Sequence, residues 1–409
     1  MSKEDLITGL DLGTTKISAI IAEVNEKSEI NIVGVGTTPS YGLRRGVVVN
    51  LDKTVQGIRQ AVGEAELMAG VKVNNVVVGI AGDHIKSFNS RGVIAVSRTE
   101  EGISNEDIKR VIEQAKAVTI PMDRKIIHVL PQDYTVDDQT GIKEPVGMAG
   151  VRLEAEVHVV TAAITAIQNI VKSIERANLA IRNIVLQPYA SSFAVLDEEE
   201  KELGVCLLDV GGGTTDFSIF FEGSIRHTSV VGLGGVNITN DIAIGLRTPR
   251  AQAEEIKKRY GAALSSLVDT NETMEVPGVG GRKKREVSRQ ILASIIEPRI
   301  EEVFSLVERE IKRSGFDDRL TAGIVLTGGT AKMEGIEQLA ERIFDLPVKV
   351  GIPKGIVGLT DAVSDPVHAA GIGLIVYGYK HRDEEGFFER KAGLLDRFIR
   401  RIVNWFKSI

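Results

Sequence analysis

The sequence predicts an α/β protein in which one structural unit occurs twice. Residues 9–18 and 207–218 share a pattern: an apolar strand, an aspartate, a glycine-rich turn with two threonines, and a second strand. Residues 324–333 add a third glycine turn, between a buried apolar strand and the start of a helix. Short apolar runs beside glycine turns are typical of β-strands, and a mixture of such strands with helices indicates the α/β class.

The composition is that of a large globular protein. The 409 residues are enough for two or three domains, and 43% hydrophobic and 26% charged residues exclude a disordered, collagen-like or disulfide-rich chain. The net charge is −6, but residues 390–409 hold six basic residues and one acidic residue, so the rest of the chain carries −11. An acidic body disfavours nucleic acid as a partner, and a basic, apolar end favours an anionic surface.

Several common sites are absent from the sequence. It contains no GxxxxGK[ST] loop, GxGxxG helix start, GxSxG turn, HExxH pair or CxxC pair, and its six histidines lack metal-ligand spacing. Cys206 lies in an apolar run, so we expect a buried, unreactive thiol and a reducing compartment. The charged N-terminal residues predict no secretory signal, and no apolar run is long enough for a membrane span. We therefore expect a cytosolic protein with at most peripheral membrane contact.

The repeated turns predict a phosphate site, although a pair of ordinary hairpins is the alternative. Glycines let backbone amides converge on one anion, and threonine hydroxyls add further donors. Asp11 and Asp209 stand at equivalent places beside the turns, where Mg²⁺ with retained waters would separate them from phosphate. Two such turns that face each other would hold a polyphosphate from both sides. The expected phosphate ligands are Gly13, Thr14, Thr15, Lys16, Gly211, Gly212, Gly213, Thr214 and Thr215.

Three further segments complete the expected site. Gly328 and Gly329 would allow a flat ring to lie against the backbone. Glu254 and Lys257 lie one helical turn apart on one face, where they would hold a ribose and a base edge or form a solvated ion pair. Residues 232–237 predict a tight turn before a helix, close to phosphate. The remaining candidates in these segments are Gly234, Gly235, Asn237, Thr330 and Met333.

The motifs GLDLGTTK, LLDVGGGTTDFSIF, GLGG and VLTGGTAKMEG resemble those of the actin, sugar-kinase and chaperone ATPase superfamily. Their order and spacing over nearly the whole chain are similar to those of the bacterial cell-division FtsA family. The resemblance implies an actin-like bilobed fold of duplicated RNase H-like domains, with ATP and Mg²⁺ between the lobes. It places Asp11 and Asp209 at hydrated Mg²⁺ and Gln187 at the attacking water. The superfamily pattern varies at Gln187 and Asp216, so the resemblance implies ATP binding and leaves the rate of ATP hydrolysis open, with slow hydrolysis as one alternative.

The resemblance also implies a division into domains. Residues 83–160 show the pattern of an α+β segment, with a helix at 105–117 that Ser104 would cap. In the FtsA family this segment is a small inserted domain, 1C, that replaces a usual actin subdomain. The expected parts are the first lobe (1–82, 161–195 and about 366–380), the inserted domain (83–160), the second lobe (196–365, with subdomain 2B at about 227–302), a linker (381–392) and a terminal helix (393–409).

The terminal helix is expected to be amphipathic. At 100° per residue its large apolar side chains fall on one half of the helix and its charged side chains on the other. Its 17 residues span about 25 Å, too short for a bilayer, so we expect it to lie among anionic headgroups. A helix packed on its own domain is the alternative. The expected membrane contacts are Leu394, Leu395, Arg397, Phe398, Ile399, Arg400, Arg401, Ile402, Val403, Trp405, Phe406, Lys407 and Ile409.

A basic run at 280–285 predicts either a solvated loop or a partner surface. In FtsA-like proteins this region resembles the lobe that binds the acidic, apolar C-terminal peptide of FtsZ, with Arg285, Arg289 and Arg299 as the expected contacts. The resemblance further implies self-assembly into filaments, which multiplies weak membrane attachment. It also implies contacts of the inserted domain with other division proteins, and a place on the cytoplasmic face of the cell membrane at the division site.

Other members of the superfamily predict different features. A sugar kinase needs a base for its acceptor hydroxyl, and no further acid suits that role. A chaperone ATPase adds a large substrate domain, which we do not expect here. A rod-shape actin homologue does not explain residues 83–160 or a C-terminal anchor. We therefore expect a membrane-bound, polymerising division protein rather than a metabolic enzyme, with a sugar kinase or a rod-shape homologue as alternatives.

Overall fold

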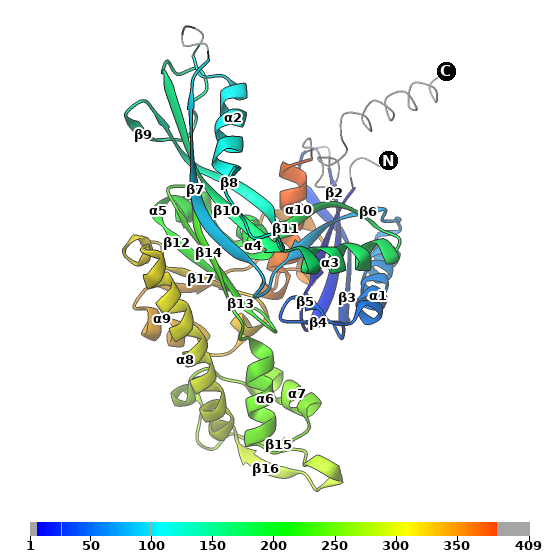
Figure 1. Cartoon of the computed structure of the whole chain (residues 1–409). Helices are drawn as coiled ribbons and strands as arrows, with labels where there is room; N and C mark the ends of the chain where they lie inside the picture. The colour runs from blue at the N-terminus through cyan, green and yellow to red at the C-terminus, as the bar shows by residue number, and fades with distance from the viewer. Residues whose placement is uncertain (1–5, 26, 98–99, 101, 383–409) are drawn as a thin grey trace, which may run out of the picture.

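The structure, a computed structural model, describes residues 6–25, 27–97, 100 and 102–382. The terminal helix expected at 393–409 and most of the preceding linker lie outside these residues. Figure 1 shows two lobes, each with a central sheet, a small domain at one end of the molecule and a helical arm at the other. Within the described part of the chain, no helix combines the length and apolar character needed to cross a membrane.

Both lobes contain the same five-strand arrangement. The order is β11-β6-β1-β2-β3 in the first lobe and β18-β17-β12-β13-β14 in the second. In each sheet an antiparallel hairpin is flanked by two parallel strands on one side and one antiparallel strand on the other. The strands are β1 (Leu6–Leu12), β2 (Lys16–Val24), β3 (Ile30–Pro39), β6 (Asn75–Ile80), β11 (Ala180–Leu186), β12 (Val205–Val210), β13 (Thr215–Phe221), β14 (Ser224–Val231), β17 (Ile324–Thr327) and β18 (Val348–Val350).

The hairpin strands are buried on both faces because their side chains alternate between two cores. On β1, Leu10 packs with α1 (Leu51–Ala69) and α3 (Ile164–Arg176), whereas Ile7 packs with α4 (Gln187–Val195) and α10 (Ala369–Lys380). On β12, Leu207 joins the same α4 and α10 core. The helices α4 and α10 therefore lie between the two sheets. A Cβ on Gly373 would lie 1.9 Å from the Ala190 carbonyl oxygen, so their backbones are in contact.

The inserted segment forms its own four-stranded sheet, in the order β7-β10-β8-β9, with one helix packed on it. The expected helix at 105–117 is confirmed as α2 (Asn105–Lys116), and Ser104 and Asp107 form a capping box at its start. Figure 1 shows this domain above the second lobe, with α2 on one side of the sheet. The strands are β7 (Lys86–Ala95), β8 (Arg124–Val136), β9 (Gln139–Ile142) and β10 (Arg152–Ala163).

The helical arm belongs to the second lobe and ends in a two-stranded ribbon (Figure 1). It contains α6 (Gly235–Gly245), α7 (Arg250–Tyr260), the first part of α8 (Arg289–Ser314), β15 (Thr273–Val276) and β16 (Arg285–Ser288). The other short elements are β4 (Leu43–Arg44), β5 (Val47–Val48), α5 (Glu198–Leu203), α9 (Ile336–Phe344), β19 (Ile356–Gly358) and the 3₁₀ turns Ser265–Leu267, Val279–Gly281, Asp317–Arg319, Gly329–Lys332, Thr360–Ala362 and Pro366–His368.

Two details differ from, or add to, the expected organisation. Strand β19 lies within the range assigned to the second lobe, but it pairs in parallel with β3 of the first lobe. The chain therefore returns to the sheet of the first lobe by residue 356, before the boundary near 365 that the family resemblance implied. Cys206 on β12 is buried and free, and burial raises the pKa of its thiol, as expected for an unreactive cysteine.

Candidate functional site

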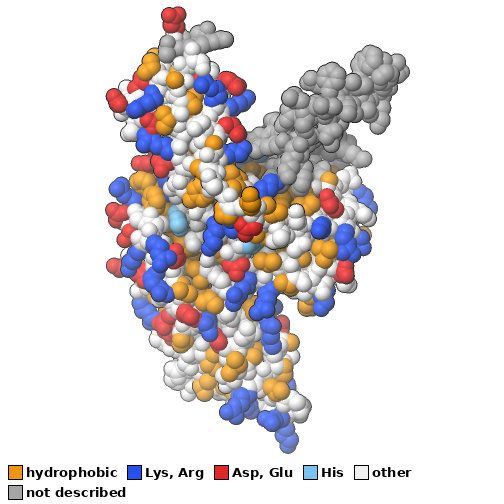
Figure 2. Space-filling view, in the orientation of Figure 1, with side chains coloured by type: hydrophobic (Ala, Val, Ile, Leu, Met, Phe, Trp, Pro, Cys, Tyr) orange, Lys and Arg blue, Asp and Glu red, His pale blue; other side chains and the backbone are white. Residues whose placement is uncertain are grey.

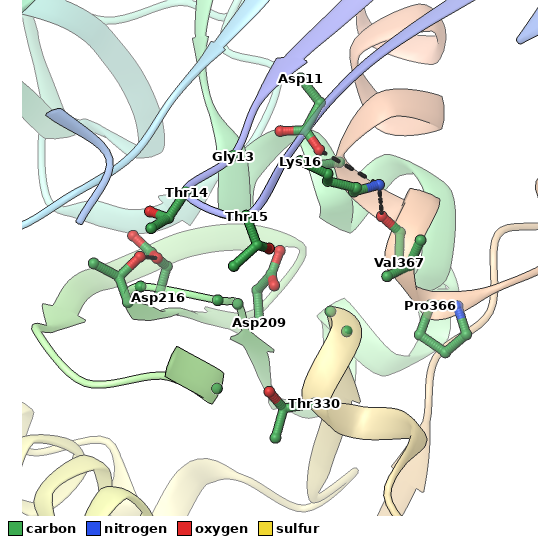
Figure 3. Close-up of a pocket in the computed structure, with 18 of the residues that line it drawn as sticks. Asp11, Gly13, Thr14, Thr15, Lys16, Asp209, Asp216, Thr330, Pro366 and Val367 are labelled. Atoms are coloured by element: carbon green, nitrogen blue, oxygen red, sulfur yellow. Dashed lines mark hydrogen bonds and ion pairs between the residues drawn. The ribbon is translucent and has the colours of Figure 1, made fainter. Parts of the chain in front are cut away.

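A cavity of about 510 Å³ lies between the lobes, where the β1–β2 and β12–β13 hairpin tips meet (Figure 3). A Cβ on Gly212 would lie 2.5 Å from Thr15, and a Cβ on Gly213 would lie 2.4 Å from Thr14. The two tips therefore face each other in one shared cavity. Only glycine on the second tip permits this approach.

The two tips are built in the same way. Asp11 lies opposite Ser18 in the first hairpin, and Asp209 lies opposite Asp216 in the second. A hydrogen bond of 2.9 Å from the Gly13 amide to the Lys16 carbonyl closes the first turn, and the corresponding bond in the second turn is 3.0 Å. Because the strand pairing of the two hairpins has the same register relative to the turn, the two aspartates occupy equivalent positions at the cavity.

On the first lobe a polar cluster surrounds Asp11. Gln187 Nε2 donates a hydrogen bond of 2.7 Å to Asp11 Oδ1, and a Cβ on Gly79 would lie 2.8 Å from the Gln187 side chain. Lys16 Nζ donates to the Val367 carbonyl at 2.6 Å and lies 3.9 Å from Asp11 Oδ2 (Figure 3). Burial raises the pKa of Asp11 and lowers that of Lys16. The opposite charge of each group partly offsets this effect, because it stabilises the ionised form of the other group.

On the second lobe two carboxyls lie close together, with Asp216 buried and Asp209 half-buried. Burial, together with the nearby charges of Asp216 and Asp11, raises the pKa of Asp209 to about 7, although Lys16 and the Ser191 hydroxyl act in the opposite direction. Burial also raises the pKa of Asp216 to about 6, although the Thr214 hydroxyl donates to its Oδ2 at 2.6 Å. Gly328 has φ +85°, and a Cβ there would lie 2.3 Å from Asp209 Oδ1. The site therefore concentrates negative charge that a cation would stabilise.

The opposite wall of the cavity comes from α6 and α7. Lys257 Nζ donates to the Gly235 carbonyl and to the Thr239 hydroxyl, both at 2.9 Å, and it pairs with Glu254 at 2.8 Å. Burial would raise the pKa of Glu254, but Lys257, the Thr239 hydroxyl and Lys258 together outweigh this effect, and the pKa is lowered. Glu254 and Lys257 thus form a partly buried ion pair that lines the cavity.

Comparison with known proteins decides the family. The chain is 52% identical to the cell-division protein FtsA of Pseudomonas aeruginosa over 93% of its length, covering 90% of that protein. The chain belongs to the FtsA family. It is also 50% identical to FtsA of Neisseria meningitidis and 40% identical to FtsA of Escherichia coli K12, with 98% of both chains covered in each case. Residues 206–373 match the family model "Cell division protein FtsA", and residues 82–161 match "SHS2 domain inserted in FTSA".

Solved structures with little sequence identity confirm the actin-like fold. The chain aligns with the PilM–PilN type IV pilus biogenesis complex at a TM-score of 0.65 and 16% identity, over 91% of this chain and 98% of that one. It aligns with MreB5 of Spiroplasma citri bound to ADP at a TM-score of 0.54 and 15% identity, over 93% and 99%. The predicted bilobed fold with an inserted domain is therefore confirmed.

Most residues selected from the FtsA-like motifs line the cavity, but three do not. The Thr215 hydroxyl donates to the Leu233 carbonyl at 2.9 Å, and the Gly234 amide donates to Asn237 Oδ1 at 3.1 Å. These residues shape the turn before α6. The lining residues among the candidates are Asp11, Gly13, Thr14, Thr15, Lys16, Gln187, Asp209, Gly211, Gly212, Gly213, Thr214, Gly235, Glu254, Lys257, Gly328, Gly329, Thr330 and Met333.

Sequence reasoning missed several lining residues of this FtsA-family cavity. Asp216 was not selected as a ligand, although its place opposite Asp209 in a hairpin is a usable signal. The backbone carbonyl of Val367 accepts a hydrogen bond from Lys16, and no pattern of side chains in the sequence predicts this contact. Gly46 lies far from the motifs, and its amide donates to the Thr14 hydroxyl at 3.2 Å.

The three arginines expected at a peptide site lie in the helical arm, away from the cavity, and each bonds within the chain. Arg285 donates to the Leu246 carbonyl at 2.6 Å. Arg289 pairs with Glu272 at 2.6 Å and also with Glu334, and Arg299 binds both oxygens of Asp241 at 2.6 and 3.0 Å. Figure 2 shows further Lys and Arg side chains at the tip of the arm, where residues 282–285 are exposed.

The raised pKa values of Asp209 and Asp216 predict a pH-dependent stability. Both carboxyls ionise less readily in the folded chain than an unfolded aspartate of pKa about 4, so the folded state binds more protons between these values. The free energy of unfolding should therefore fall as the pH rises from about 4 to about 7. Urea unfolding without nucleotide or metal should show a smaller fall for Asp209→Asn, with a gain in stability at pH 7.

The exposed Asp361 provides a matched control for this experiment. The variant Asp361→Asn should keep the pH dependence of the parent chain. If the free energy of unfolding fell equally steeply with pH in Asp209→Asn and in the parent, Asp209 would not be a source of the pH dependence.

Proposed function

We propose that this FtsA-family chain is an ATP-binding, filament-forming adaptor that attaches division proteins to the cytoplasmic face of the cell membrane. The observation that carries the proposal is the meeting of two equivalent hairpin tips at one cavity between the lobes. Its volume, about 510 Å³, lies in the range of small-molecule sites.

The chemistry of the cavity walls fits a magnesium-bound triphosphate. The backbone of both tips and the Lys16 ammonium would hold phosphate oxygens, and glycines leave room for them. Asp11 and Asp209 would hold Mg²⁺ through its waters. Among the described residues no three acidic, histidine or cysteine side chains are close enough to bind a metal directly, which favours a hydrated ion. Mg²⁺ bound there would supply charge neutralisation for the phosphates.

The remaining walls suit adenosine and water. Gly328 and Gly329 present backbone on one side of the cavity, and the Glu254–Lys257 pair presents polar atoms on the other. Gln187 lines the same cavity with its amide held by Asp11, and we propose that it orients the attacking water. The similarity in fold to MreB5, solved with ADP, supports nucleotide binding.

The membrane role rests on residues 393–409, which lie outside the described part of the chain. Their basic and apolar halves, next to an acidic body, support an interfacial helix. The FtsZ peptide would bind the helical arm, near Arg285, Arg289 and Arg299, and the inserted domain would contact other division proteins. The similarity in fold to the double helical filament of MamK, at a TM-score of 0.51, supports self-assembly.

Loss of the Lys16 charge should weaken nucleotide binding. Charge-assisted hydrogen bonds contribute about 1.5–3 kcal/mol, so Lys16→Ala should raise the Kd of a fluorescent ATP analogue roughly tenfold or more. Removal of Mg²⁺ by chelation should also raise the Kd in the parent chain. Lys312→Ala, an exposed lysine on α8, should bind like the parent. Equal binding by Lys16→Ala and Lys312→Ala would defeat the proposed site.

Trp405 is the single tryptophan of the chain and lies on the apolar half of the expected helix. Its fluorescence should shift to the blue with anionic vesicles, and less with zwitterionic ones, because the ring enters the lipid interface. Phe398→Asp should abolish the shift, whereas Phe387→Asp, in the linker, should preserve it. An unchanged spectrum with anionic vesicles would refute the anchor.

An acidic, apolar peptide labelled with a fluorophore should bind the helical arm. Arg299→Ala removes a cation from this surface and should weaken binding about tenfold, with a smaller effect at high salt. Arg313→Ala, near the other end of α8, is the matched control and should bind normally. If fluorescence anisotropy gave the same affinity for both variants, the arm would not be the peptide site.

A further inference from the structure

Strand β8 of the inserted domain contacts both lobes. Near its start, His128 Nε2 accepts a hydrogen bond of 3.0 Å from the Leu186 amide of the first lobe. Four residues further along, Gln132 Nε2 donates to the Ile225 carbonyl of the second lobe at 2.6 Å. A single strand thus bridges elements that belong to different lobes, over a distance of about 13 Å along its axis.

The contact with the second lobe is buried and polar. Asp133 pairs with Arg226 at 2.5 Å, and Arg226 and Gln132 are 7% and 3% exposed. Strand β7 of the same domain reinforces the contact with β14, since the Ser87 hydroxyl donates to the Thr228 carbonyl at 2.9 Å. Buried polar groups are costly to leave unpaired, so β8 should follow β14 when the second lobe moves.

The contact with the first lobe lies next to the cavity. Leu186 ends β11 and is the N-cap residue of α4, a helix without a side-chain cap. The following residue is Gln187, which donates to Asp11. His128 is 7% exposed, and its ring packs edge-on against Tyr189 of α4, with ring centroids 5.6 Å apart. His128 therefore holds the backbone from which Gln187 reaches the cavity.

We propose that His128 is a positioning residue for Gln187, through which β8 couples the inserted domain and the second lobe to the cavity. A displacement of β8 relative to β11 shifts the Leu186 amide and moves the Gln187 side chain against Asp11. The kinetic consequence rests on the proposed function, because it requires that the cavity hydrolyse a nucleotide. The effect of His128 on the position of the Gln187 side chain does not depend on the proposed function.

The positional consequence is tested by NMR of side-chain amides without nucleotide. The Gln187 resonance is identified by its loss in Gln187→Ala. His128→Phe keeps a ring beside Tyr189 but removes the acceptor, so the Gln187 resonance should move. His128→Gln restores an acceptor and should bring it back toward the parent position. The control is His381→Phe, which changes a ring stacked on Tyr377, itself a neighbour of Tyr189, and which should leave the Gln187 resonance in place. An unmoved Gln187 resonance in His128→Phe overturns the proposal.

A second variant tests the link from the far end of β8 and does not alter His128. Gln132→Leu removes the bond to the Ile225 carbonyl and should also move the Gln187 resonance. Gln139→Leu, at an exposed position of the same domain, should not. In the unaltered chain, ¹⁵N spectra should show His128 Nε2 without a proton. A protonated Nε2, or equal effects of Gln132→Leu and Gln139→Leu, overturns the coupling.

The kinetic consequence separates this inference from the proposed function. His128→Phe should lower kcat for ATP hydrolysis roughly ten- to hundredfold, with the Kd for nucleotide within about twofold of the parent. Because both residues would act through one side chain, His128→Phe with Gln187→Ala should be no slower than Gln187→Ala alone. Additive losses would refute positioning. A parent chain that binds no nucleotide would refute the proposed function, while the NMR shifts would still decide the role of His128.

Discussion

The close approach of two hairpin tips is the constraint on which the rest of this structure depends. Each tip carries threonines or glycines where larger side chains would collide, and the two sets interlock at Thr14, Thr15, Gly212 and Gly213. The equal register of the two hairpins then brings an aspartate from each lobe to the same cavity. Because each tip is anchored in its own sheet, a change in the angle between the lobes must alter the distance between the tips.

The charged side chains at this contact lack enough partners of opposite charge within the chain, and this deficit indicates a functional site. Burial raises the pKa of Asp11, Asp209 and Asp216 and lowers that of Lys16, the opposite of what a site optimised for stability alone would show. Such an arrangement is typical of a functional site that gains its missing charge from a ligand. The Glu254 carboxylate contrasts with these aspartates, since Lys257, Thr239 and Lys258 lower its pKa.

Helices α4 and α10 and strand β8 connect this cavity to the outer surfaces. The two helices lie in contact between the sheets, and each begins at the cavity wall, with Gln187 on α4 and Ala370 on α10. Strand β8 joins the inserted domain to both lobes through buried polar contacts. Through His128, the inserted domain is therefore attached to the junction of β11 and α4, from which Gln187 reaches the cavity.

The sequence by itself determined the class of fold, the duplicated tips and most of the cavity lining. Local patterns carry this information: glycine turns after apolar strands locate the tips, and a serine before an acidic first turn locates α2. The pairing of β19 with β3, the contact of the Val367 carbonyl with Lys16 and the hydrogen bond that His128 accepts were decided only by the tertiary structure. The physical reason is that these features depend on backbone atoms and on strand pairing between distant segments. A backbone carbonyl or amide is present at every residue, so only the folded arrangement shows which of them meets a partner.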